Sequence, residues 1–311
     1  SRDRAAVHLH DIGVRIVENA QGERGFEILV GGGLGRTPRI ARVIHDFLPK
    51  EDLLSYLEAI LRVYNSHGRR DNKFKARIKI LVDALGPAEF KRQVEIEWEL
   101  IRNGVMKLTD DELERVAGHF VPPTYETLDP THDDVSTKAL DPNRGFARWL
   151  QSNVHAHKVD GYSSVVISLK RPGIPPGDAT ADELDRIAEL SEQFGFGRIV
   201  VTHRQNLVLP DVQSAKLREL WTALDELNLG LPNYNHATDI IACPGLDYCN
   251  LANARSIPIA EGITRRLEDV DYLHDVGELT LNISGCINAC GHHHVGHIGI
   301  LGIDKQGIEH Y

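Results

Sequence analysis

All four cysteines of this chain lie in one stretch, residues 241–302, and this clustering limits what the region can be. They form two pairs, Cys243/Cys249 and Cys286/Cys290, with five and three intervening residues. Disulfides are typical of small domains that lack a sufficient core, whereas this chain has 311 residues. Structural zinc prefers about two to four residues between paired ligands, and a cubane cluster tolerates more varied spacing. The spacing favours an iron–sulfur cluster over zinc, with inert buried thiols as a further alternative.

Two runs of sequence surround these pairs. The first is Cys243-Pro-Gly-Leu-Asp-Tyr-Cys249, and the second is Ser284-Gly-Cys286-Ile-Asn-Ala-Cys290-Gly. Together they resemble the cluster signature of the siroheme-containing sulfite and nitrite reductases. The resemblance extends over nearly the whole chain and is closest to sulfite reductase hemoprotein (beta) subunits. Ile287 stands where proline is usual and Ala289 where serine is frequent, but neither side chain would supply a ligand.

The resemblance implies an α+β fold with mixed-sheet siroheme/Fe–S domains and a ferredoxin-like half-domain. It implies that Cys243, Cys249, Cys286 and Cys290 hold a [4Fe–4S] cluster, with Cys290 also bridging to the siroheme iron. The implied activity is the six-electron reduction of sulfite to sulfide, with a flavoprotein or a ferredoxin as electron donor. Reduction of nitrite to ammonia is one alternative. A non-catalytic scaffold that binds a cluster or zinc is another, of a different class.

The composition of the chain limits which kinds of partner and which location are expected. The net charge of −10 argues against nucleic acid as a main partner, and the apolar runs are too short to predict a transmembrane span. Free thiols suit a reducing cytoplasm, which is the predicted location.

The first stretch of the chain predicts a β-hairpin. Residues 7–17 and 26–30 alternate as strands do, and Gln21-Gly22 lies between them as a turn. The second strand runs into Gly31, Gly32 and Gly33, where backbone can approach a ligand closely. A flexible loop is the alternative, and we favour a surface that touches a cofactor.

A basic segment follows a predicted helix over residues 53–64. Residues 69–79 hold six positive charges and one negative. If the segment is helical, Arg69, Lys73 and Arg77 stack at i, i+4 and repel unless an anion neutralises them. A solvated basic face is equally consistent with the charges alone. The resemblance implies that Arg77, and with it Arg70, contacts the carboxylates of siroheme. Helices are predicted to continue to about residue 103.

The second half predicts the order β-α-β-β-α between residues 165 and 230, with a capping box at Thr180. The polar turn 202–206 lies between two of the strands, and the resemblance implies that Gln205 in this turn contacts siroheme, with Arg204 a weaker candidate. His292–His294 could suggest a metal site, but a strand is expected after Cys290, and alternate residues of a strand point to opposite faces, so a structural or cluster-adjacent role is favoured. The predicted division is 1–120, a linker at 121–145, 146–232 and 233–311.

An internal repeat links residues 11–14 to residues 297–300, each followed by a glycine turn. The repeat and the resemblance together suggest a piece of a longer protein that lacks an N-terminal part and a C-terminal end. The substrate lysines are then expected upstream of Ser1, so we expect no catalytic residue here, negligible turnover by this piece alone, and some self-association.

Overall fold

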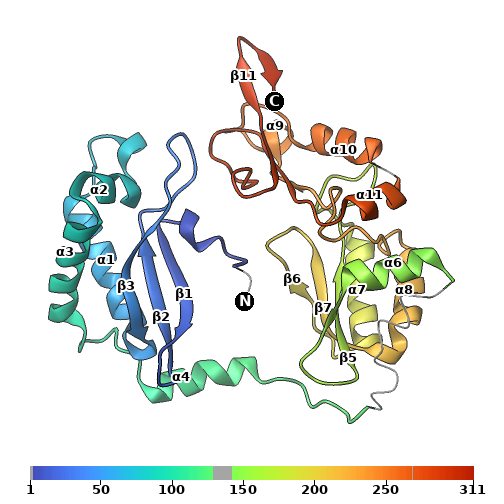
Figure 1. Ribbon diagram of the computed structural model, residues 1–311, viewed down its shortest axis with the longest axis horizontal. Helices are drawn as coiled ribbons and strands as arrows, with labels where there is room; N and C mark the ends of the chain where they lie inside the picture. Colours follow the sequence, from blue (N-terminus) through green and yellow to red (C-terminus); the bar gives the residue numbers. More distant parts are fainter. Residues whose placement is uncertain (1–2, 129–141, 268) are drawn as a thin grey trace. The chain divides into compact units, whose positions relative to one another are not determined.

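The computed structural model describes residues 3–128, 142–267 and 269–311 (Figure 1). The chain forms two compact units, Ser1–Pro122 and Pro123–Tyr311. The predicted four-part division stays a prediction. Within the described ranges, no helix is both long and apolar enough to cross a membrane.

The first unit is built on a three-stranded antiparallel sheet in the order β1-β2-β3, formed by Ile12–Glu18, Arg24–Val30 and Arg42–Pro49. β1 and β2 form the predicted hairpin, which is confirmed by a continuous register from Ile12 opposite Val30 to Glu18 opposite Arg24. The turn between them contains Gly22 at φ 80°, in the left-handed region that glycine adopts without strain. Val7–Leu9, predicted as the beginning of the first strand, instead form a short turn of 3-10 helix, η1, whose first backbone N–H donates to the side chain of Asp3.

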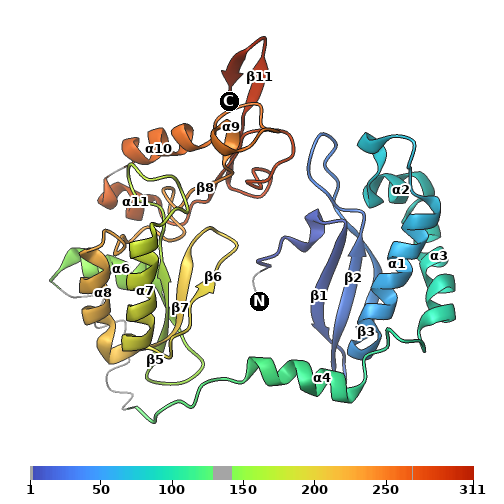
Figure 2. The same cartoon turned by 180° about the vertical axis from the view of Figure 1, so that it is seen from behind.

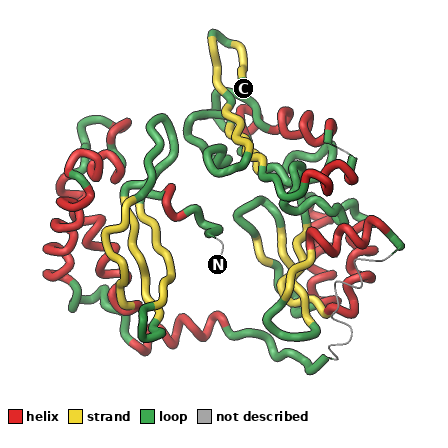
Figure 3. The backbone as a smooth tube through the Cα atoms, viewed as in Figure 1, coloured by secondary structure: helices red, strands yellow, loops and turns green. Residues whose placement is uncertain are grey.

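Helices cover one face of this sheet (Figure 3). Buried Tyr56, Ile60 and Val63 recur at helical spacing along the first helix and face the sheet, as the sequence predicts. Phe90, Val94 and Trp98 do the same from the third helix. The elements of this layer and its edge are η2 (Lys50–Asp52), α1 (Leu53–His67), η3 (Lys73–Lys75), α2 (Ile78–Leu85), α3 (Pro87–Ile101), α4 (Asp110–Ala117) and η4 (Gly118–Phe120).

The basic segment 69–79 is not one helix, so the expected i, i+4 stacking does not occur. α1 ends at His67, and after Gly68 the chain is extended until a single turn at η3. The side chain of Asn72 accepts a hydrogen bond from the backbone N–H of Phe74 and starts this turn. α2 then begins at Ile78, so Arg77 lies just before a helix rather than within one. The local asparagine turn replaces the charge-repelling helix that the spacing suggested.

The second unit contains a four-stranded antiparallel sheet in the order β4-β5-β7-β6. Helices α6, α7 and α8 pack on it around a core of Trp149, Leu190 and Leu220 (Figure 2). The predicted strands, helices and capping box at Thr180 are confirmed. The first helix and the first strand of this layer, α6 and β4, were not predicted from the sequence. The bounds are α6 (Arg144–Asn153), β4 (Val154–Ala156), β5 (Tyr162–Ile167), α7 (Ala181–Phe194), β6 (Val200–Val201), β7 (Leu207–Gln213), η6 (Ser214–Lys216) and α8 (Leu217–Asp225).

The cysteines belong to a smaller parallel sheet in the same unit, in the order β10-β9-β8. Its core is small and centres on Ile240 and Ile283, which are fully buried. A two-stranded hairpin follows at the C-terminal end of the chain. The elements are β8 (Ile241–Ala242), α9 (Gly245–Tyr248), α10 (Ile257–Arg266), α11 (Val270–Val276), β9 (Leu281–Ser284), β10 (Ile298–Leu301), β11 (Ile303–Lys305) and β12 (Ile308–His310).

The capping box at α7 generates a pH prediction. The hydrogen bond from Arg171, and then the one from the backbone N–H of Thr180, lower the pKa of Glu183 to about 2. This lowered pKa stabilises the fold fully above the ordinary value of 4.5, and the stabilisation is lost as the pH falls toward 2. Glu183→Gln should therefore cost about 1 kcal/mol at pH 7, and its deficit should shrink between pH 4.5 and 2.

Urea denaturation across this pH range measures the effect. Glu192→Gln, on the same helix and exposed, is the control and should stay within about 0.5 kcal/mol of the wild type throughout. A deficit of Glu183→Gln that does not change with pH would contradict the assignment.

Candidate functional site

The two cysteine pairs lie in the loops that follow two neighbouring parallel strands. Cys243 comes directly after β8, and Cys249 follows α9 six residues later. Cys286 comes after β9, and Cys290 follows a turn in which Ala289 adopts φ 59°. Because β8 and β9 are parallel, their carboxyl ends lie at the same edge of the sheet. The fold therefore brings the two loops that carry the cysteines to one edge of the sheet.

The other three thiols influence the pKa of Cys290. Burial raises the pKa of the Cys290 thiol, and the thiols of Cys243, Cys286 and Cys249 raise it further. No three His, Cys, Asp or Glu side chains in the described part of the chain are arranged to hold a single metal ion. A single metal ion needs its ligands to meet at one point. A cubane cluster takes one thiolate on each of four separate irons.

Backbone and hydroxyl groups surround the sulfur of Cys243. The backbone N–H of Gly285 donates to Cys243 Sγ at 3.1 Å, and Ser256 Oγ lies 3.5 Å from the same sulfur. Ser256 is fully buried and also donates to the carbonyl oxygen of Cys243. The Gly285 N–H and the Ser256 hydroxyl thus fix the loop around Cys243 from two sides, one through the sulfur and one through the carbonyl oxygen. Ser256 could not be predicted from the sequence, because no local pattern links it to Cys243, thirteen residues earlier.

Three glycines next to the cysteines allow the loops to pack this closely. A methyl group on Gly245 would lie 2.6 Å from the backbone nitrogen of Ser256, and one on Gly285 would lie 2.5 Å from the carbonyl oxygen of Ala254. A methyl group on Gly291 would overlap the carbonyl oxygen of Ile283. These glycines were also missed, because the sequence analysis singled out only the run at 31–33.

The histidine run after Cys290 lies in turns, so the expectation of a strand there is wrong. β10 begins only at Ile298, and His292 adopts φ 53°. The imidazole rings of His293 and His294 have centroids 4.0 Å apart. Burial, and then the imidazoles of His294 and His292, lower the pKa of His293. The hydrogen bonds from the Asn282 amide to the carbonyl oxygens of residues 291 and 292, at 3.0 and 3.1 Å, hold the turn against β9.

In the first unit, Arg77 joins the glycine loop to the start of β1. It donates to both carboxylate oxygens of Asp11 at 2.9 and 2.7 Å, a bidentate pair. Its Nη2 lies 2.9 Å from where a methyl group on Gly33 would stand. The buried ammonium of Lys79 donates to the carbonyl oxygens of Leu34 and Thr37 at 2.8 and 2.9 Å. Arg77 and Lys79 therefore hold the loop, and Lys79 is a residue that the sequence analysis missed.

The other two glycines of the loop pack against the start of the chain and α2, whereas Arg70 lies against α1. A methyl group on Gly32 would lie 2.5 Å from the carbonyl oxygen of His8, and one on Gly31 would touch Val82. The backbone of this loop is thus packed against the protein on at least one side. Arg70 donates to the side chain of Asn65 at 2.8 Å and stacks over the ring of Tyr64.

In the second unit, Gln205 is bonded to the strand that leads to Cys243. Its Nε2 donates to the carbonyl oxygen of Ala242 at 2.9 Å, and its Oε1 accepts from the backbone N–H of Ala242 at 3.1 Å. Both polar atoms of this side chain therefore have partners within the protein.

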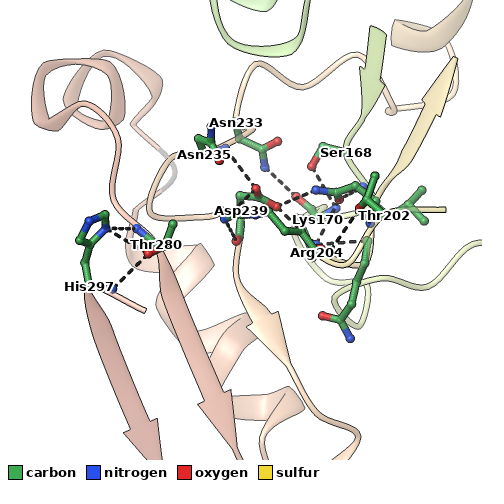
Figure 4. Close-up of polar contacts among 12 residues, drawn as sticks. Ser168, Lys170, Thr202, Arg204, Asn233, Asn235, Asp239, Thr280 and His297 are labelled. Atoms are coloured by element: carbon green, nitrogen blue, oxygen red, sulfur yellow. Dashed lines mark hydrogen bonds and ion pairs between the residues drawn. The ribbon is translucent and has the colours of Figure 1, made fainter. Parts of the chain in front are cut away.

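A buried ionic network supports the turn that carries Gln205 (Figure 4). The ammonium of Lys170 donates to the carbonyl oxygens of Arg204 and Gln205 at 2.6 and 3.1 Å, and lies 3.3 Å from Oδ1 of Asp239. Burial lowers the pKa of Lys170, and Asp239 opposes that shift. Asp239 also accepts from Asn206 at 2.9 Å and pairs with Arg204 at 3.1 Å. The network joins the end of β5, the β6–β7 turn and the approach to β8.

Comparison with known proteins gives the family. The nitrite and sulphite reductase 4Fe-4S domain matches residues 1–101, and the nitrite/sulfite reductase ferredoxin-like half domain matches residues 166–227. The chain belongs to the siroheme-type sulfite and nitrite reductase family, and its α+β fold is that of the family. This membership supports a [4Fe–4S] cluster and siroheme as the cofactors.

Some of the similar proteins are named sulfite reductases and others are named nitrite reductases. Sulfite reductase [ferredoxin] 1 of Mycolicibacterium paratuberculosis is 28% identical over 94% of this chain and 46% of its own length. The assimilatory ferredoxin-dependent nitrite reductase of Haloferax mediterranei is 29% identical over 96% of this chain and 47% of its own. The solved structure of the Mycobacterium tuberculosis NirA protein is similar with a TM-score of 0.69 and 25% identity, over 99% of this chain and 50% of that one. The chain spans about half the length of these relatives.

The close approach at Gly291 generates a stability prediction. Gly291→Ala should lower the free energy of unfolding by about 2 kcal/mol or more, because the new methyl group would push the Cys290 loop away from β9. Gly262→Ala, inside α10 where the same methyl group meets only a side-chain end, is the matched control and should be neutral or stabilising. Thermal unfolding of both variants measures this, and equal stabilities would contradict the packing argument.

Proposed function

We propose that the protein is a sulfite reductase of the siroheme type, reducing sulfite to sulfide with electrons from a ferredoxin. Four cysteines placed at one edge of a parallel sheet carry the proposal, together with the family to which the chain belongs. The names of the relatives support ferredoxin as the donor, and they give no such support to a flavoprotein, the alternative donor.

The preference for sulfite over nitrite rests on the run from Cys243 to Cys249, which is closer to the sulfite enzymes. Nitrite reduction to ammonia is the second candidate, because a relative of almost the same identity is named a nitrite reductase. The two reactions use the same cofactors, so the residues of the site do not separate them.

In this proposal, Cys243, Cys249, Cys286 and Cys290 hold the cluster, and Cys290 also faces the siroheme. When bound, the cluster and siroheme supply the multi-electron chemistry that side chains cannot perform. The protein's own part is to hold the thiols in position. At Cys243, the N–H of Gly285 donates to the sulfur at 3.1 Å, and the hydroxyl of Ser256 donates to the carbonyl oxygen of the same residue.

We also propose that Arg70, Arg77, Gln205 and the loop Gly31–Gly33 contact siroheme. The geometry of Arg77 supports a carboxylate contact, because its guanidinium donates two parallel hydrogen bonds to the carboxylate of Asp11. It is nearly half exposed, at 45% of its side chain, so a carboxylate of the cofactor can reach it. The three glycines of the loop beside it are buried, and Gly33 leaves room for the Arg77 guanidinium, so in this proposal the loop sets the position of Arg77.

Metal analysis of the intact protein, purified without oxygen, tests the cluster. The wild type should hold about four iron atoms and matching acid-labile sulfide, and Cys286→Ser or Cys290→Ser should lose most of this iron. Gly262→Ala should retain it. Iron content that is unchanged in both serine variants would overturn the assignment of the cysteines. Steady-state rates with sulfite and with nitrite then separate the two candidate functions.

Substitution of Arg77 tests the siroheme contact. Arg77→Glu should reduce bound siroheme several-fold, because it sets a carboxylate against carboxylates, while Arg77→Lys should lose less since it keeps the charge. Arg92→Glu is the charge-matched control, because Arg92 is an exposed arginine of the same unit and pairs with Glu89 as Arg77 pairs with Asp11. Siroheme extracted per chain is the measurement, and normal content in Arg77→Glu would remove Arg77 from the site.

A further inference from the structure

The strand that delivers Cys243 is very short. β8 has only two residues, Ile241 and Ala242, and it forms one edge of the parallel sheet. On its inner side, Ala242 lies opposite Ile283 of β9, and the N–H of Cys243 donates to the carbonyl oxygen of Ile283 at 3.1 Å. Such a strand has few ladder bonds to fix the position of the cysteine that follows it.

The outer side of β8 is held by the side chain of Gln205. In a strand, the N–H and C=O of one residue point to the same side, so both groups of Ala242 face away from β9. The Gln205 amide donates to this C=O at 2.9 Å and accepts from this N–H at 3.1 Å. It thereby pairs with Ala242 as the peptide group of a further strand would.

Contacts with Lys170 and Gly177 fix the position of Gln205. Gln205 adopts φ 57°, an uncommon conformation for a residue with a side chain, at the tip of the β6–β7 turn. The buried ammonium of Lys170 binds the carbonyl oxygens on both sides of it, those of Arg204 and Gln205. Gly177 lies against its Cβ, where a further methyl group would stand at 2.9 Å. The turn cannot easily relax to aim this side chain elsewhere.

From this geometry we propose that Gln205 is a positioning residue for the first cluster cysteine, Cys243. Its carboxamide serves as a one-residue strand that completes the edge of β8 and so fixes where the sulfur of Cys243 stands. The inference rests on the proposed cluster site and adds to it a role for the ferredoxin-like half-domain. That half-domain reaches the cluster through Gln205.

The test compares Gln205→Met with Gln205→Ala and the wild type, all as intact protein purified without oxygen. Methionine has nearly the length of glutamine and keeps the packing against Gly177, but it removes both hydrogen bonds to Ala242. Gln213→Met, on β7 of the same sheet, is the matched control. We expect Gln205→Met to lose its cluster to an iron chelator about tenfold faster than the wild type, because groups that orient metal ligands typically contribute 10–100-fold.

Two further readouts separate positioning from general stability. The electron paramagnetic resonance spectrum of the reduced cluster should change its g values in Gln205→Met and not in Gln213→Met. Hydrogen exchange at the Ala242 amide, which needs no cluster, should become at least about tenfold faster in Gln205→Met, since that amide loses its acceptor.

Each outcome decides the inference. Faster cluster loss with a shifted spectrum in Gln205→Met supports it, and a variant that matches the wild type in both overturns it while leaving the proposed function intact. Faster amide exchange together with an unchanged cluster would also overturn it, because the bonds would then hold β8 without positioning Cys243. A wild type that takes up no cluster would overturn the proposed function and this inference together.

Discussion

The second unit depends on one buried ammonium group. Lys170, 2% exposed, holds together three segments that are far apart in the sequence: its own strand end, the turn at 204–206, and Asp239. A buried lysine without partners would be costly, so the four oxygen acceptors around it must all stay in place. Once they are in place, the turn aims Gln205 at β8, and β8 leads directly into Cys243. The geometry of the thiol site is therefore set largely by contacts made outside it.

Local sequence patterns predicted the parts of the fold that are governed by local physics. The hairpin at residues 12–30, the helix at 53–67 and the capping box at Thr180 each follow from alternation, helical spacing or a cap, and the structure confirms them. The same reasoning failed at residues 69–79 and 292–294. In both places a turn formed by a few local hydrogen bonds replaced the regular element that the spacing suggested.

The candidate site divides in a similar way. The four cysteines were found because two spaced pairs form a pattern within one short stretch. Lys170 and Asp239 are 69 residues apart, and Gln205 and Ala242 are 37 apart, so neither pair leaves a local trace. Ser256 acts through a hydrogen bond to Cys243, and Gly291 through its close packing against Ile283. A single sequence does not show such contacts. Their roles follow only from the packed structure.

The pairing of Gln205 with Ala242 has a consequence for how this protein behaves as it is being made. A strand edge with free N–H and C=O groups is a template to which another chain can add, and that is how many proteins begin to aggregate. At β8 those groups are taken by a side chain, and a side chain cannot be extended into a further strand. The edge next to the cysteines is thus closed to strand addition by contacts of the protein alone, with no part played by a cofactor.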